Sequence, residues 1–150
     1  MEKSTFIYVT YIRTTQKKLW QALITPEFQR QYWNGAHMES DWKKGSPWKL
    51  GYSDDNITDR GSIIECRPLK RLVIKWRNEF MPTLKSEGFS VCTMDLEPVS
   101  GTVVKLTITH SIDRPKSKLI NAVSGGWPYI LSNLKSLLET GKIVLKKYKR

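Results

Sequence analysis

The sequence predicts an α+β fold, in which an antiparallel sheet of six to seven strands is covered by a long C-terminal helix and two short helices follow the first strand. Three observations support this. The chain has 150 residues, 39% of them hydrophobic, which suits one domain over residues 1–150. Residues 36 to 112 form short segments separated by turns, many with alternating polarity. An apolar stripe at helical spacing then follows near the C-terminus.

The first 35 residues predict one strand and two short helices. Phe6–Ile12 is rich in β-branched and aromatic residues, which favour a strand. Thr14 or Thr15 can cap a first helix. The sequence Thr-Pro-Glu at 25–27 starts a second, because threonine caps, proline suits the first turn and an acid there suits the helix dipole. Asn34-Gly35 ends that helix.

Five segments between residues 46 and 112 predict strands. They are Ser46–Tyr52, Gly61–Arg67, Arg71–Arg77, Phe89–Glu97 and Thr102–Ile112. Short turns between such strands favour an antiparallel meander. The polar stretch from 53 to 59 is predicted to be a turn, and the stretch from 78 to 88 an unusually apolar loop.

The C-terminal part predicts a short helix and then a long one. Lys116–Val123 is compatible with a helix, which Ser124-Gly125-Gly126 is expected to break. A second helix from Trp127 to Thr140 would be roughly 21 Å long at 1.5 Å per residue, with Gly141 as its C-terminal cap. Its apolar stripe consists of Trp127, Ile130, Leu131, Leu134, Leu137 and Leu138.

The two cysteines, Cys66 and Cys92, are expected to be free and mostly buried. In a meander the strand Leu72–Trp76 lies between them, which separates their strands by about 9.5 Å. A disulfide needs Cα atoms within about 7 Å. Two cysteines and two scattered histidines also argue against a structural zinc site, so no metal is expected.

The charge balance is strongly basic, with 25 Lys and Arg against 14 Asp and Glu, a net charge of +11. A field of this sign attracts nucleic acids, anionic lipids or acidic proteins. The basic residues are nevertheless spread along the chain, and no basic–aromatic recognition motif accompanies them. We therefore interpret residues 142–150 as a solvated basic extension and do not expect nucleic-acid binding. Its basic residues are Lys142, Lys146, Lys147, Lys149 and Arg150.

Neither a membrane span nor a secretion signal is expected. The apolar runs are far shorter than the ~20 residues that a transmembrane helix needs. The first residues, Met-Glu-Lys-Ser-Thr, are not followed by the apolar core of a signal peptide. We therefore expect a cytoplasmic protein.

Three motifs follow one another in order along the chain. The first is Leu-Trp-Gln-Ala-Leu-Ile-Thr-Pro-Glu at 19–27, followed by Tyr32-Trp33. The second places Gly61, Glu65, Pro68, Leu72 and Trp76 at fixed spacing. The third runs through Gly101-Thr102, Leu106–His110, Gly126-Trp127-Pro128, Leu131, Leu134, Leu138 and Glu139. Together they resemble the SRPBCC, or START-like, superfamily, and within it the branch of the activator of heat-shock-protein ATPase homologue domain.

The resemblance implies the helix-grip fold, in which a curved sheet wraps around the long helix and leaves a cavity between them. Members of the superfamily bind lipids, sterols, polyketides or other apolar ligands there. We therefore expect binding of a small hydrophobic or amphipathic ligand, such as a lipid, a polyketide or an aromatic compound. The candidate cavity residues are Trp33, Trp48, Tyr52, Trp76, Phe80, Met81, Met94, Ile108, His110, Trp127, Ile130, Leu131 and Leu134.

His110 is the polar residue of greatest interest, because it shares the inward phase of Leu106 and Ile108. An inward imidazole can act as a general base or hold a polar ligand group, but a hydrogen-bonded core histidine is the favoured interpretation. His37 is expected to be exposed. Glu65 is expected to pair with an arginine such as Arg67 or Arg77, or to enter the cavity.

The evidence for an enzyme is weak. The sequence has no recognisable nucleophile–histidine pair and no phosphate-binding fingerprint, so we assign no catalytic residue and expect no cofactor.

The resemblance also implies an alternative function, as a protein-interaction domain that contacts a chaperone and raises its ATP turnover. A cavity of several hundred cubic ångströms would favour ligand binding. A solid core with an exposed apolar patch would favour a protein partner.

Overall fold

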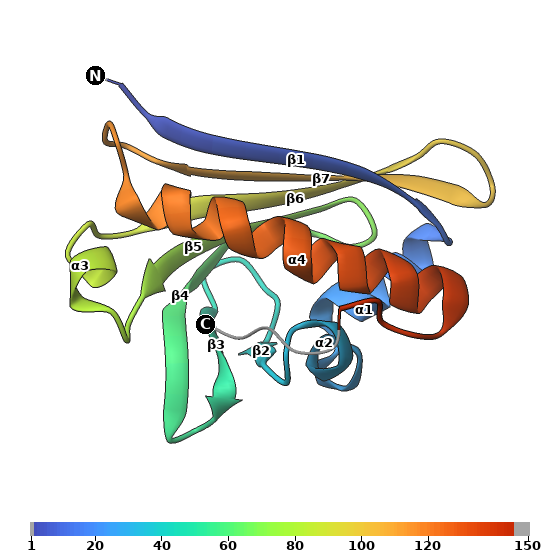
Figure 1. Ribbon diagram of the computed structural model, residues 1–150, viewed down its shortest axis with the longest axis horizontal. Helices are drawn as coiled ribbons and strands as arrows, with labels where there is room; N and C mark the ends of the chain where they lie inside the picture. The colour runs from blue at the N-terminus through green and yellow to red at the C-terminus, as the bar shows by residue number, and fades with distance from the viewer. Residues whose placement is uncertain (1, 146–150) are drawn as a thin grey trace.

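One seven-stranded sheet and the long helix α4 dominate the molecule, and α4 lies across one face of the sheet (Figure 1). The computed structural model describes residues 2–145. The predicted α+β fold is confirmed. In chain order the elements are β1 (Ser4–Arg13), α1 (Gln16–Ile24), α2 (Pro26–Tyr32), β2 (His37–Ser40), β3 (Pro47–Ser53), β4 (Asn56–Arg67), β5 (Arg71–Asn78), α3 (Pro82–Lys85), β6 (Ser90–Pro98), β7 (Val103–Ile112) and α4 (Lys118–Thr140).

The strand order is β1-β7-β6-β5-β4-β3-β2, and every neighbouring pair is antiparallel. Strands β2 to β7 therefore form the predicted meander. Only β1 departs from it, because the chain crosses from β1 through α1 and α2 to the opposite edge of the sheet. Register shifts between Leu50 and Gly51 and between Ile63 and Glu65 mark irregularities, which bend strands locally.

The main core lies between the sheet and the helices. Strand β7 shows the pattern most clearly, because Val104, Leu106, Ile108 and His110 are buried in strict alternation with partly exposed residues. The buried residues of α4 include Leu119, Ile120, Trp127, Leu131 and Leu134. The inward phase predicted for these strand residues is thus confirmed.

The cysteines lie on β4 and β6, with β5 between them. Both are free, as predicted, although Cys66 is only partly buried while Cys92 is fully buried. Burial raises the pKa of both thiols.

The expected helix break at Ser124-Gly125-Gly126 was wrong. Helix α4 runs without interruption from Lys118 to Thr140, which at 1.5 Å per residue is about 34 Å. The Ser117 side chain caps its start by accepting from the Ile120 amide at 3.1 Å, and Gly141 ends it with a φ of 81°. A helical glycine costs only about 1 kcal/mol relative to alanine. Burial of apolar residues on both sides of the glycines outweighs that cost.

Three further expectations need correction. The turn predicted from 53 to 59 is shorter, because β4 already begins at Asn56. The apolar loop after β5 contains the short helix α3. His37 is buried on β2 rather than exposed, because β2 pairs with β3 and places His37 opposite Gly51. Most of the basic cluster, residues 146–150, lies outside the described residues.

Candidate functional site

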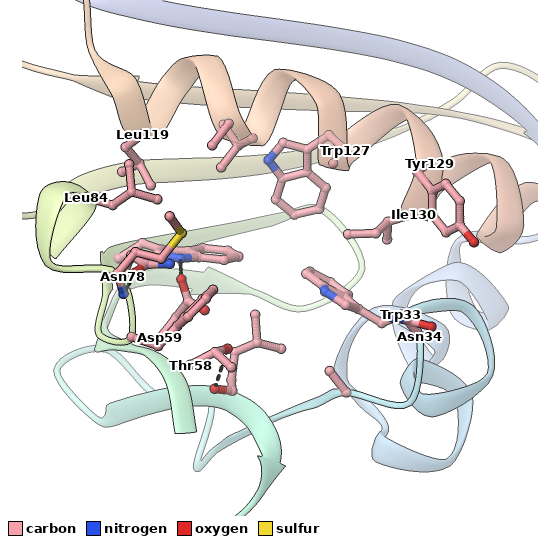
Figure 2. Close-up of a pocket in the computed structure, with 18 of the residues that line it drawn as sticks. Trp33, Asn34, Thr58, Asp59, Asn78, Leu84, Leu119, Trp127, Tyr129 and Ile130 are labelled. Atoms are coloured by element: carbon pink, nitrogen blue, oxygen red, sulfur yellow. Dashed lines mark hydrogen bonds between the residues drawn. The ribbon is translucent and has the colours of Figure 1, made fainter. Parts of the chain in front are cut away.

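A cavity of about 300 Å³ lies between α4 and the β4–β5 region of the sheet (Figure 2). Leu84 and Leu119 lie at one end of it, and Asn34 and Tyr129 lie at the other. Its walls come from the end of α2, from strands β3 to β5, from the α3 segment and from the first half of α4. The lining residues are Trp33, Asn34, Ala36, Leu50, Tyr52, Thr58, Asp59, Trp76, Asn78, Phe80, Met81, Leu84, Leu119, Ala122, Val123, Gly126, Trp127, Tyr129 and Ile130.

Three tryptophans form an aromatic wall of this cavity. Trp33 follows α2, Trp76 lies on β5 and Trp127 lies on α4. The ring centroids of Trp33 and Trp127 are 5.3 Å apart, those of Trp76 and Trp127 are 5.9 Å apart, and those of Trp33 and Trp76 are 6.5 Å apart. Three elements distant in sequence thus meet through these rings. Aromatic pairs at such distances stabilise each other beyond the area they bury.

Gly61 leaves space on the inner face of the sheet between two tryptophans of the neighbouring strands. It lies between Trp48 on β3 and Trp76 on β5 in the strand register, and the rings of these two tryptophans are 4.5 Å apart. A Cβ atom at position 61 would overlap the backbone carbonyl of Lys75. Only glycine fits this place without moving the neighbouring strand.

His110 is linked by hydrogen bonds to two tryptophans of the aromatic wall, to Trp127 directly and to Trp76 through Ser90. Trp127 Nε1 donates a hydrogen bond to His110 Nδ1 at 3.1 Å, so Nε2 carries the proton of the neutral ring. His110 Nε2 then donates to Ser90 Oγ at 2.8 Å, and Ser90 Oγ donates to the Trp76 carbonyl at 3.1 Å. Burial lowers the pKa of His110 to about 3. The favoured interpretation, a hydrogen-bonded core histidine, agrees with this geometry.

Asp59 forms the polar edge of the cavity. It is buried on β4 and accepts a hydrogen bond from Trp76 Nε1 at 2.6 Å (Figure 2). Asn78 lies opposite it on β5, and Thr58 donates to the Leu50 carbonyl at 3.2 Å. Among the described residues that line the cavity, Asp59 is the one acidic side chain and none is lysine or arginine.

Seven of the thirteen predicted residues line the cavity and six do not. Those that line it are Trp33, Tyr52, Trp76, Phe80, Met81, Trp127 and Ile130. The other six, Trp48, Met94, Ile108, His110, Leu131 and Leu134, are buried in the core. The cavity borders only the first half of α4. Farther along, Leu131 and Leu134 are fully packed and leave no space.

Sequence reasoning missed Asp59 and Asn78. A signal for both was present, because Asp59 lies two residues before Gly61 and Asn78 two residues after Trp76, in the inward phase of each strand. Both lie just outside the predicted strands, because the strand predicted from Gly61 begins too late and the strand predicted to Arg77 ends too early. Glu65 pairs with Arg67 at 2.7 Å, one of the two expected partners, and does not line the cavity.

A family model described as Activator of Hsp90 ATPase homolog 1-like protein matches residues 13–139. The chain belongs to this family. The resemblance drawn from the three motifs is thus confirmed. No curated protein matches the chain.

Solved structures share the fold. A protein from Mesorhizobium loti has a TM-score of 0.75 and 22% identity, over 90% of this chain and 96% of that one. The Aha1 dimer from Colwellia psychrerythraea has a TM-score of 0.72 and 19% identity, over 93% and 98%. An HSP90 activator from Plasmodium falciparum has a TM-score of 0.72 and 19% identity, over 89% and 95%.

The described residues contain neither a metal-binding cluster nor a membrane-spanning helix. No group of three or more His, Cys, Asp or Glu side chains within residues 2–145 could hold a metal ion. No helix in that part of the chain is long and apolar enough to cross a membrane.

Proposed function

We propose that this family member binds a small amphipathic ligand in the cavity beneath α4. The observation that carries the proposal is the combination of an aromatic wall, formed by Trp33, Trp76 and Trp127, with one buried carboxylate at its edge. Ligand sites are typically concave and mostly apolar, with a few placed polar groups. A volume of about 300 Å³ is at the low end of such sites, which favours a compact ligand over a long lipid chain.

The cavity suggests how such a ligand would be held. Its apolar body would lie against the indole rings, where burial of apolar surface contributes about 25 cal/mol per Å². Its polar group would face Asp59, Thr58 or Asn78. Tyr52, Phe80 and Met81, which are each partly exposed, would contact the outer part of the ligand.

Two adjacent glycines of α4 offer a matched test. Gly126 lines the cavity and Gly125 does not, and a Cβ atom added at either position meets nothing within 4 Å. Gly126→Leu should fill the cavity, whereas Gly125→Leu should leave it empty. Both changes remove a helical glycine, so both should preserve or raise stability.

Binding would be measured in two ways. Native mass spectrometry with solvent extraction, on protein purified from its own cells, should find a discrete small molecule in the wild type and in Gly125→Leu but not in Gly126→Leu. The neutral fluorescent probe N-phenyl-1-naphthylamine should show the same order. Equal binding by all three proteins would contradict a site in this cavity.

A second candidate function, contact with a chaperone, is favoured by the outer face of β1. Ile7, Val9 and Tyr11 are 60%, 44% and 52% exposed, and they form a row on one side of an edge strand. The family match and the Plasmodium falciparum relative, described as an HSP90 activator, support the same idea. We propose that such a chaperone would bind this row.

The test measures the ATP turnover of an HSP90-type chaperone with and without this chain. Wild type should raise the turnover, and Ile7→Thr with Val9→Thr should abolish the effect while the Gly126→Leu variant retains it. An unchanged turnover with wild-type protein would exclude this function.

A further inference from the structure

We infer that residues 142–145, the C-terminal strap, control how fast a ligand enters and leaves the cavity by fastening to α4 at one end of it. This inference rests on the proposed function and adds a gate to the proposed site. It comes from the path of the strap along α4, from the polar contacts that hold it, and from its bond to Tyr129, a residue of the cavity lining.

The C-terminal strap turns back from the end of α4 and runs along one face of the helix. Gly141, with a φ of 81°, ends α4 and reverses the direction of the chain (Figure 1). From there the strap bonds in order to the side chains of Ser136, Asn133 and Tyr129. Residues three or four apart lie on one face of a helix, so the strap follows that face toward the middle of α4. The family model matches residues 13–139, so the strap lies beyond the part of the chain that the model covers.

Asn133 fastens the strap to the helix. It is 2% exposed, and within the described residues every hydrogen bond of its side chain goes to the backbone of the strap. Its Oδ1 accepts from the amides of Val144 and Leu145, at 3.1 and 2.7 Å. Its Nδ2 donates to the Leu145 carbonyl at 2.8 Å. A buried amide group needs such partners, so the strap and Asn133 satisfy each other.

The end of the strap is held by polar contacts, which allow it to open. Val144 and Leu145 are 62% and 38% exposed, so their side chains bury little apolar surface. Once the strap lifts, water can replace its hydrogen bonds to Asn133, which limits the free energy that opening costs. Segments with few buried apolar contacts open locally without unfolding of the domain. The strap therefore has the properties of a reversible latch.

The strap ends beside the cavity. Tyr129 lines the cavity at the end that it shares with Asn34, and its hydroxyl points away from Trp127 (Figure 2). That hydroxyl donates to the Leu145 carbonyl at 3.4 Å. Asn34 is exposed, so this end of the cavity reaches the surface. A fastened strap helps to hold the Tyr129 side chain in place there, and an open strap removes that contact and eases the passage of a ligand.

The test changes the strap and leaves the cavity lining intact. The double variant Val144→Pro with Leu145→Pro removes both amide donors to Asn133. Val144→Ala with Leu145→Ala is the matched control, because it shortens the same two side chains and keeps both amides. Residues 144 and 145 are exposed, so neither variant alters the core. The probe is N-phenyl-1-naphthylamine, and its association and dissociation rates would be measured by stopped-flow fluorescence.

We expect the proline variant to bind and to release the probe about tenfold faster than the wild type, with an unchanged Kd. The alanine control should keep the wild-type rates. A tenfold change corresponds to about 1.4 kcal/mol, the order of one net hydrogen bond. A gate changes both rates by the same factor, because it alters the passage of the ligand and not the bound state. A strap that only stabilises α4 would leave both rates unchanged, which would overturn the inference.

The outcomes separate this inference from the proposed function. Equal rates in the wild type and the proline variant, with probe binding that Gly126→Leu abolishes, would overturn the gate and leave the cavity as the site. An increase in the dissociation rate alone would overturn it too, because the strap would then contact the bound ligand. Equal acceleration by the alanine control would show that the amide bonds to Asn133 do not fasten a gate. Failure of the probe to bind the wild type would count against both the gate and the proposed function.

Discussion

His110 should make the stability of this protein fall steeply in mild acid. Its imidazole is fully buried and accepts a hydrogen bond from Trp127, an arrangement that only the neutral ring can make. Its cross-strand neighbours are Phe6 on β1 and Cys92 on β6, and neither offers a negative charge. The imidazolium would therefore lack compensation in the folded state.

The size of the effect follows from the two pKa values. In the unfolded chain a histidine takes up a proton below a pKa of about 6.5, whereas in the folded protein burial lowers the pKa of His110 to about 3. Between these values the unfolded state binds more protons, so stability decreases as the pH falls. From pH 7 to pH 4.5 this one group should remove about 2.5 kcal/mol from the free energy of unfolding, and by pH 5.5 about 1.3 kcal/mol.

The assay is urea unfolding followed by tryptophan fluorescence at pH 7.0, 5.5 and 4.5, for wild type and for His110→Gln. Glutamine can still accept from Trp127 but does not titrate. All other titrating groups are common to both proteins, so the difference between their unfolding free energies isolates His110. That difference should change by about 2.5 kcal/mol over the range, in favour of the variant in acid. A difference that stays constant would refute the buried neutral imidazole.

Three further predictions concern stability and reactivity. Gly61→Ala should destabilise by about 3 kcal/mol in urea unfolding, because its methyl group overlaps the neighbouring backbone; a loss under about 1 kcal/mol would mean that β5 yields easily. Glu87→Gln should cost about 1 kcal/mol at pH 7, because the carboxylate accepts from the Lys118 amide at the start of α4. The pKa of Glu87 is lowered in the folded protein, so the cost should decrease as the pH falls, and an equal cost at pH 7 and pH 3 would contradict a charge effect. A thiol-specific reagent should modify Cys66 before Cys92, whose pKa burial raises further; equal rates in the folded protein would contradict the burial of Cys92.

The order of the elements could be predicted because its signals are local. Alternation along β7 assigns Leu106, Ile108 and His110 to the inner face with no knowledge of the partner strands. Capping residues at Thr15 and Gly141 likewise mark helix ends through their own backbone and side chains. The family could be identified for a similar reason, since its motifs are residues at fixed spacing.

Local signals failed where tertiary packing opposed them. The glycines at 125 and 126 predicted a break, but the packing of α4 on the sheet keeps the helix continuous. Strand β4 was predicted to begin at Gly61, although pairing with β3 extends it to Asn56 and brings Asp59 inward. In both places contacts with distant residues override the local signal of the sequence.

The sequence by itself determined which residues face inward, and the tertiary structure decided which inward residues line a cavity. The alternation of each strand places both Ile108 and Trp76 on the inner face of the sheet. In the structure Ile108 is packed in the core, whereas Trp76 lines the cavity. The difference depends on whether side chains from several elements fill the space beside the residue, and the lining of the cavity comes from α2, β3, β4, β5, the α3 segment and α4 together. No periodicity within a single segment encodes such packing.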